Sequence, residues 1–212
     1  MDKARHNAEV YNQYVHEYID KFMDLGLYRD TFDHLLSVLP KEAKVLELGC
    51  GPGNVIKYMS SCRPDLHFLG IDLAPEMIRA AQSHNPQAQF RVMDIREAGS
   101  IKEQFDAVIA AFCIPYLTAD DLPVFFAYLC DLTLSKGLLY VSCMEGVPER
   151  SGFEKTSFTG NHEMYISYYS RSTIEDLIER NNFDIEKFYT KDYPESDGSF
   201  TTELAYVARK YL

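Results

Sequence analysis

The spacing of apolar positions changes along the chain, and each change predicts a different element. Residues 6–23 and 28–39 place apolar side chains at i, i+3, i+4 and i+7, which predicts two amphipathic helices. Short apolar runs of strand length then alternate with helical segments, and these runs lie at 45–48, 68–72, 90–95, 105–112 and 137–144. Strands that alternate with helices form a parallel sheet covered on both faces, so the pattern predicts an α/β fold.

The last third of the chain carries a weaker pattern. Residues 145–169 follow no regular period but contain five aromatic side chains, so we expect a long substrate-side loop rather than a disordered segment. A capping-box pattern at 172–175 predicts a helix that runs to Arg180. Residues 183–189 and 203–210 predict a closing pair of strands.

The length of 212 residues fits one domain. Within it we expect a helical cap at 1–40 and a ligand-binding core at 41–144. The substrate-side loop follows at 145–170, and a C-terminal helix with a strand pair at 171–212.

The segment 45–53 carries the strongest candidate chemistry. A buried strand runs into Gly49, Gly51 and Gly53, and a helix is expected to begin at Asn54. Such a turn presents backbone N–H groups to a ligand. Asn54 stands where a dinucleotide fingerprint needs glycine, and no Gly-Lys-Ser/Thr triplet of a P-loop follows. The alternative interpretation is a turn that only links a strand to a helix.

The pattern Glu47-x-Gly49-x-Gly51-x-Gly53 resembles the first motif of class I S-adenosylmethionine-dependent methyltransferases. Asp72 ends the second strand 21 residues after Gly51, a position that brings a carboxylate beside a ribose in a βαβ unit. The following Asp-x-x-x-x-Met-Ile resembles the second motif of the family. A helix cap would explain Asp72 in part, but it leaves the spacing to Gly51 as coincidence.

Two further segments extend the resemblance. It implies that Asp94 accepts a hydrogen bond from the adenine amino group and that the Ile95 N–H contacts a ring nitrogen. Phe-Asp-x-Val-Ile at 105–109 is similar to the entry to the fourth motif. The resemblance thus implies S-adenosylmethionine as cofactor, S-adenosylhomocysteine as product, and a Rossmann-like seven-stranded sheet whose last strand is antiparallel. The implied cofactor-binding residues are Glu47, Gly49, Cys50, Gly51, Gly53, Asp72, Leu73, Met77, Asp94, Ile95 and Phe112.

The catalytic residues are less clear from the sequence, because an activated methyl donor needs no general base for every acceptor. The candidates are Tyr11, Tyr18, Tyr116 and His162. Each has a structural alternative: the tyrosines could belong to the core or cap, and the histidine to a solvated loop. The segment 113–117 departs from the Asn-Pro-Pro-Tyr motif of enzymes that methylate amide or nucleobase nitrogens, which lowers those possibilities.

Composition narrows the class of acceptor. The formal net charge is −11, with no basic run, so a nucleic-acid substrate is disfavoured. Five cysteines without a C-x-x-C pair indicate free thiols, and the six histidines show no metal-ligand spacing. The start of the chain shows no signal-peptide pattern, and no run of 18 apolar residues occurs, so we expect a cytoplasmic protein that does not cross a membrane.

Three functions remain at this point. The sequence favours methyl transfer to a small molecule. A basic, solvent-open groove would favour a protein or RNA methyltransferase. An occluded acceptor pocket would favour a non-catalytic protein that binds S-adenosylmethionine or S-adenosylhomocysteine.

Overall fold

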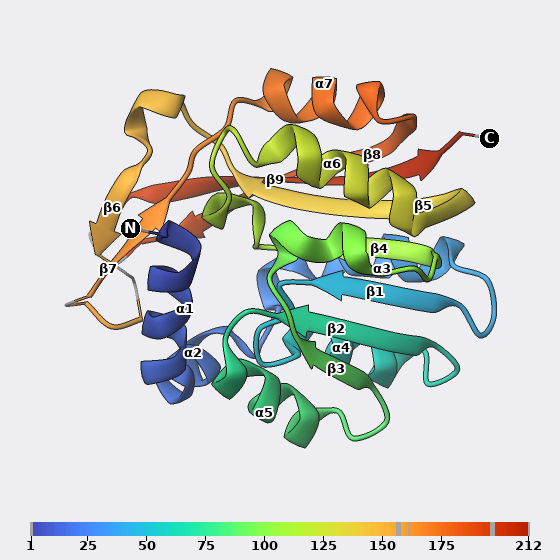
Figure 1. Ribbon diagram of the computed structural model, residues 1–212, viewed down its shortest axis with the longest axis horizontal. Helices are drawn as coiled ribbons and strands as arrows, with labels where there is room; N and C mark the ends of the chain where they lie inside the picture. The colour runs from blue at the N-terminus through green and yellow to red at the C-terminus, as the bar shows by residue number, and fades with distance from the viewer. Residues whose placement is uncertain (1, 156–157, 161, 196–197, 212) are drawn as a thin grey trace.

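The computed structural model describes residues 2–155, 158–160, 162–195 and 198–211. Seven strands form one sheet in the order β3-β2-β1-β4-β5-β9-β8 (Figure 1). The strands are β1 Lys44–Leu48, β2 His67–Asp72, β3 Gln89–Val92, β4 Phe105–Ala110, β5 Thr133–Met144, β8 Phe183–Pro194 and β9 Phe200–Lys210. The last strand, β9, runs antiparallel to both of its neighbours, β5 and β8. The prediction of a seven-stranded, mostly parallel sheet with an antiparallel last strand is confirmed.

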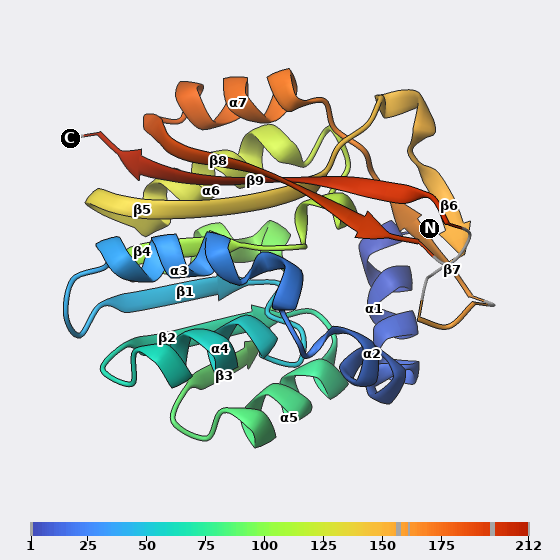
Figure 2. The ribbon, with the colours of Figure 1, turned by 180° about the vertical axis from the view of Figure 1, so that it is seen from behind.

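Helices cover both faces of the sheet. Figure 2 shows α3 and α4 on one face, and Figure 1 shows α6 and α7 on the other. The bounds are α3 Arg29–Val38, α4 Asn54–Cys62, α5 Pro75–His84, α6 Leu122–Leu132 and α7 Arg171–Arg180. Each face has its own apolar core. Phe32 of α3 stacks on Tyr140 of β5 in one, and Phe125 of α6 is fully enclosed in the other.

The single helix expected over 6–23 is wrong. The chain forms α1 Lys3–Gln13 and α2 Val15–Phe22, which are separated at Tyr14. Tyr14 leaves the helical conformation, with φ −120° and ψ 34°, and its hydroxyl lies 3.1 Å from Nε2 of His162. The break lets α1 lie across the carboxyl ends of the strands, near β7, while α2 takes a second direction (Figure 1).

The expectation of a plain loop over 145–169 is wrong in part. The segment contains the 3-10 turn η4 Pro148–Arg150 and two strands, β6 Gly152–Lys155 and β7 Glu163–Ile166, which form a separate antiparallel pair. These strands pair only with each other, and four residues are too few to show a period in the sequence. Positions 156, 157 and 161 of the predicted loop lie outside the described residues.

Three element boundaries near the site also differ from the sequence prediction. Strand β3 ends at Val92, and Asp94 instead caps the 3-10 helix η2 Ile95–Ser100. Helix α7 is capped by Ser170, whose side chain accepts a hydrogen bond from the Thr173 N–H, rather than by Ser172. Strand β4 ends at Ala110 rather than at 112, and Phe112 adopts a left-handed φ of 59°. The 3-10 turns η1 Gly26–Tyr28 and η3 Ile114–Tyr116 flank the site.

Among the described residues, no helix combines the length and the apolar character that a bilayer crossing requires.

Candidate functional site

The turn after β1 needs glycine for steric reasons. Gly49 and Gly53 have φ values of 69° and 75°, which L-residues with a side chain rarely adopt. A Cβ on Gly49 would lie 2.6 Å from Cβ of Cys113, and one on Gly53 would lie 2.5 Å from Nδ2 of Asn85. The turn therefore packs tightly against the strand end behind it and against α5, while its backbone faces a cavity.

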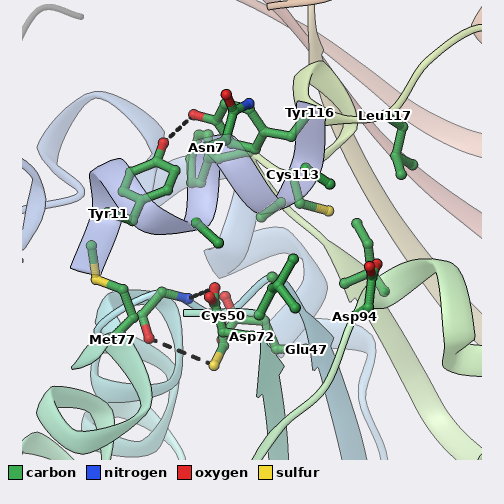
Figure 3. Close-up of a pocket in the computed structure, with 18 of the residues that line it drawn as sticks. Asn7, Tyr11, Glu47, Cys50, Asp72, Met77, Asp94, Cys113, Tyr116 and Leu117 are labelled. Carbon is green, nitrogen blue, oxygen red and sulfur yellow. Dashed lines mark hydrogen bonds between the residues drawn. The ribbon is translucent and has the colours of Figure 1, made fainter. Parts of the chain in front are cut away.

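This first cavity lies at the carboxyl ends of β1, β2 and β4, beneath α1 (Figure 3). Ten of the predicted cofactor-binding residues line it: Glu47, Gly49, Cys50, Gly51, Asp72, Leu73, Met77, Asp94, Ile95 and Phe112. Gly53 instead precedes the first turn of α4, outside this lining. The volume is about 90 Å³, which is small because Tyr11 and other residues of α1 close over it.

Glu47 is a buried carboxylate without full hydrogen bonding. It is 2% exposed, and its Oε2 has no hydrogen-bond partner in the structure. Burial and the nearby Asp72 raise the pKa of Glu47 well above its usual range. An unpaired buried carboxylate oxygen is costly. A ligand with a cationic donor at this point would satisfy it, so the residue suits the amino group of an amino-acid-like cofactor.

Asp72 connects the glycine turn to α5. Its Oδ2 accepts a hydrogen bond from the Gly51 N–H at 2.9 Å, and its Oδ1 accepts one from the Ala74 N–H at 2.8 Å. Burial raises the pKa of Asp72, while these backbone hydrogen bonds act in the opposite direction. Each oxygen retains a second acceptor site, so the same carboxylate can still bind hydroxyl groups.

Asp94 has a partner that the sequence did not reveal. The Arg96 guanidinium donates to both carboxylate oxygens of Asp94, at 2.6 to 3.1 Å. The same guanidinium reaches Oδ2 of Asp2 at 2.9 Å, which links the first residues of α1 to this corner of the cavity. Asp94 is therefore held in a fixed orientation, and an adenine amino group would have to share its oxygens with Arg96.

The three candidate tyrosines come together at one end of the cavity. The rings of Tyr11 and Tyr18 meet edge to face with centroids 5.4 Å apart. The hydroxyls of Tyr11 and Tyr116 share a hydrogen bond (Figure 3). Burial raises the pKa of Tyr11 and Tyr18 well above their usual value, and that of Tyr116 to about 12. At neutral pH these hydroxyls are protonated. The structure places the fourth candidate, His162, against Tyr14 rather than in this lining.

A second, larger cavity of about 660 Å³ adjoins the first. Five residues border both cavities and so define the passage between them: Tyr11, Tyr18, Asn54, Phe112 and Tyr116. Residues of α2, η1, the β6–β7 pair and the β8–β9 hairpin complete its walls. Sequence reasoning missed Glu203 in this wall, although an acidic residue at the start of an apolar strand run was a visible signal.

The described residues contain no group of three or more histidine, cysteine, aspartate or glutamate side chains placed to hold a metal ion.

Comparisons with known proteins relate this chain to methyltransferases. A methyltransferase-domain family model matches residues 45–137. Trans-aconitate 2-methyltransferase from Escherichia fergusonii is 35% identical over 109 residues, which cover 50% of this chain and 42% of that protein. Malonyl-(acyl-carrier protein) O-methyltransferase from Magnetococcus marinus is 32% identical over 105 residues, which cover 48% of this chain and 38% of that protein. The chain thus spans less than half the length of these curated relatives.

A solved structure extends the likeness to the whole fold. It is the 1,6-didemethyltoxoflavin-N1-methyltransferase from Burkholderia thailandensis, with bound 1,6-didemethyltoxoflavin and S-adenosylhomocysteine. The TM-score is 0.70 at 18% identity, and the match covers 99% of this chain and 89% of that one.

Proposed function

We propose that the chain is a class I S-adenosylmethionine-dependent methyltransferase and that it transfers a methyl group from S-adenosylmethionine to a small-molecule acceptor. The observation that carries the proposal is the pair of joined cavities. One cavity is lined by the glycine turn and three carboxylates, and the other has the volume of a small-molecule site.

In this proposal the first cavity holds the cofactor. Glu47 receives the amino group, Asp72 receives the ribose hydroxyls, and Asp94 with Ile95 receives the adenine edge. Bound there, S-adenosylmethionine supplies a methyl group that is already activated by its sulfonium. The first cavity is narrow under α1, so we expect α1 to move outward when the cofactor enters.

The remaining work of the protein is to position the acceptor and exclude water. Tyr11, Tyr18 and Tyr116 surround the passage through which the methyl group would be delivered. The protonated hydroxyls of Tyr11 and Tyr116 share a hydrogen bond, and the three rings would exclude water from the passage. Holding two reactants in line in a dry passage is the main source of rate when the donor is already activated.

Two observations favour a small acceptor over a macromolecule. The acceptor cavity is bounded by several elements, among them α2, the β6–β7 pair and the β8–β9 hairpin, and its volume suits a small molecule. The net charge of −11 disfavours nucleic acid. The name of the E. fergusonii relative gives trans-aconitate, a small molecule, as its acceptor.

A labelled-transfer assay tests the proposal. The protein is incubated with tritium-methyl S-adenosylmethionine and a cell extract that has been divided by filtration into small molecules and macromolecules. We expect label to enter the small-molecule fraction. Label in the protein or RNA fraction alone would contradict the assignment, and saturable cofactor binding with no transfer to any fraction would favour the non-catalytic alternative.

A further inference from the structure

Glu203 has a carboxylate on a face of β9 that also presents side chains of the apolar core. Side chains alternate between the two faces of a strand, so Glu203 of β9 shares its face with Ala205 and Val207, which belong to the core beneath α3. Glu203 is only 6% exposed, yet it lines the large cavity. Burying a carboxylate among apolar residues is costly and so calls for a functional or structural reason.

Hydrogen bonds connect this carboxylate to the passage between the cavities. Ser142 of β5 donates to Oε1 of Glu203 at 2.7 Å, and the Ser142 hydroxyl oxygen accepts from the Phe112 N–H at 2.9 Å. The Tyr28 hydroxyl also bonds Glu203, and the Tyr28 ring meets the Phe112 ring edge to face at 4.8 Å. Phe112 borders both cavities, so the carboxylate is anchored beside the place where methyl transfer would occur.

The cavity in front of Glu203 is rich in aromatic side chains, which stand beside aliphatic, polar and charged ones. Its walls contain nine rings, from Tyr11, Tyr18, Phe22, Tyr28, Phe112, Tyr116, Phe158, Tyr168 and Tyr193. Aromatic walls suit a flat molecule, which they hold by stacked and edge-to-face contacts. A carboxylate within such walls favours a flat methyl acceptor that presents a hydrogen-bond donor to it. It repels a methyl acceptor that presents a negative charge at the same point.

We infer that Glu203 is the catalytic base of this site and that the acceptor is an aromatic small molecule with an O–H or N–H group, an inference that rests on the proposed function. As the acceptor oxygen or nitrogen forms its bond to the methyl carbon, the carbon–sulfur bond of S-adenosylmethionine breaks and leaves its electron pair on sulfur. The acceptor proton goes to a Glu203 oxygen and from there to solvent. The products are the methylated acceptor and S-adenosylhomocysteine.

The surroundings of Glu203 allow a base that works near neutral pH. Burial raises the pKa of Glu203 to about 7, while the hydrogen bonds from Ser142 and Tyr28 act in the opposite direction. The closest titratable groups include tyrosines and a thiol, which are neutral at this pH: Tyr18 of α2, Tyr116 of η3, and Tyr140 and Cys143 of β5. Charged side chains of both signs also line the same cavity: Lys21 and Asp24 near α2, Arg150 of η4, Glu154 and Lys155 of β6, and Glu195 after β8. Lys191 of β8 is the cross-strand neighbour of Glu203, but its ammonium pairs with Asp30 of α3 at 2.7 Å.

The test uses 4-methylphenol as a probe with an O–H donor and toluene as a probe of similar shape without one. A phenol with a pKa of about 10 stays neutral between pH 5 and 9, so a change in its affinity over this range reports on the protein. We expect 4-methylphenol to bind at least about tenfold more tightly at pH 8.5 than at pH 5.5, because an ionised carboxylate is the stronger acceptor. In Glu203→Gln this pH dependence disappears, whereas toluene binds both proteins equally.

Two further measurements separate the possible failures. S-adenosylhomocysteine binding is titrated in wild type, in Glu203→Gln and in Glu186→Gln. The last is a control on strand β8, and its carboxylate pairs with Arg209 of β9. In the labelled-transfer assay we expect Glu203→Gln to lose at least about 100-fold in rate and Glu186→Gln to behave as wild type. Wild type without S-adenosylhomocysteine binding overturns the proposed function. Normal cofactor binding with 4-methylphenol affinity that is independent of pH, or unchanged in Glu203→Gln, overturns the assignment of Glu203.

Discussion

The Oδ2 atom of Asp72 accepts a hydrogen bond from the backbone N–H of Gly51 at 2.9 Å. One carboxylate therefore serves two purposes: it holds the glycine turn in place, and it faces the cavity where a ribose would lie. The sequence spacing between these residues, which suggests a nucleoside site, is also a requirement of the turn itself.

Replacing Asp72 should weaken cofactor binding. We expect Asp72→Ala to lower the affinity for S-adenosylhomocysteine by at least ~1 kcal/mol in calorimetric titration, because both the ribose hydroxyls and the Gly51 N–H lose an acceptor. Asp65→Ala is the matched control, since Asp65 also accepts a backbone hydrogen bond, from the Glu42 N–H at 3.0 Å, but lies outside the cavity lining. Equal affinities in wild type and Asp72→Ala would remove Asp72 from the site.

Cofactor binding should release protons from Glu47. The raised pKa of this buried carboxyl favours its protonated form in the free protein, and a cationic amino group beside Oε2 would favour the ionised form. Calorimetry in buffers of different ionisation enthalpy near pH 7 measures the release. The affinity should also rise with pH. Glu47→Gln should abolish both effects, whereas Glu103→Gln, which removes a surface partner of Lys44, should retain them. Proton uptake on binding would contradict this account.

The closed position of α1 should control how fast the cofactor enters and leaves. The buried Asn7 side chain bonds the Tyr165 backbone twice, as donor to its carbonyl oxygen and as acceptor from its N–H, both at 2.9 Å. Asn7→Ala removes these two bonds between α1 and β7 and leaves a third, from the His6 imidazole to the Glu163 carbonyl oxygen at 2.9 Å. We expect faster amide exchange over 3–13 and faster dissociation of S-adenosylhomocysteine in stopped-flow measurements. Gln13→Ala, on the same helix but exposed, is the control, and unchanged rates in Asn7→Ala would show that α1 is not the barrier.

The buried carboxyl of Glu203 should make stability depend on pH. A folded-state pKa of about 7 against a usual 4.5 means that the stabilising contribution of the protonated group is complete below pH 4.5 and is lost as the pH rises through 7. Glu203→Gln has no such loss. The difference in unfolding free energy, Glu203→Gln minus wild type, should therefore be larger at pH 8 than at pH 4.5, by up to about 3 kcal/mol. Denaturant unfolding of both proteins at the two pH values measures this, and a difference that does not change with pH would contradict the burial argument.

Much of the fold could be predicted because its signals are local. The alternation of strand-length runs and helical segments fixes the parallel part of the sheet, and the turn at Gly49 and Gly53 follows from steric demands that only glycine meets. The break at Tyr14 could not be predicted, since the apolar face continues through it and the cause is tertiary packing. The β6–β7 pair was missed because its strands are short.

The site shows the same division. Residues within motifs, such as Glu47 and Asp72, are placed in the cavity as the spacing suggested. Side-chain contacts were not visible in the sequence: Arg96, only two residues after Asp94, turns back to bond its carboxylate, and Glu203 reaches the large cavity from the last strand. His162 was a reasonable candidate by residue type alone, but it packs against Tyr14. Residue type identifies possible chemistry, and only the fold decides which residues meet.

The measurement that most directly tests the central claim is calorimetric titration of the purified protein with S-adenosylhomocysteine, with NAD as the control ligand. Both ligands contain an adenosine that an acidic residue such as Asp72 could hold, but only the first presents the amino group that suits Glu47. We expect saturable binding of S-adenosylhomocysteine at one site and no binding of NAD. Binding of NAD alone, or of neither ligand, would contradict it.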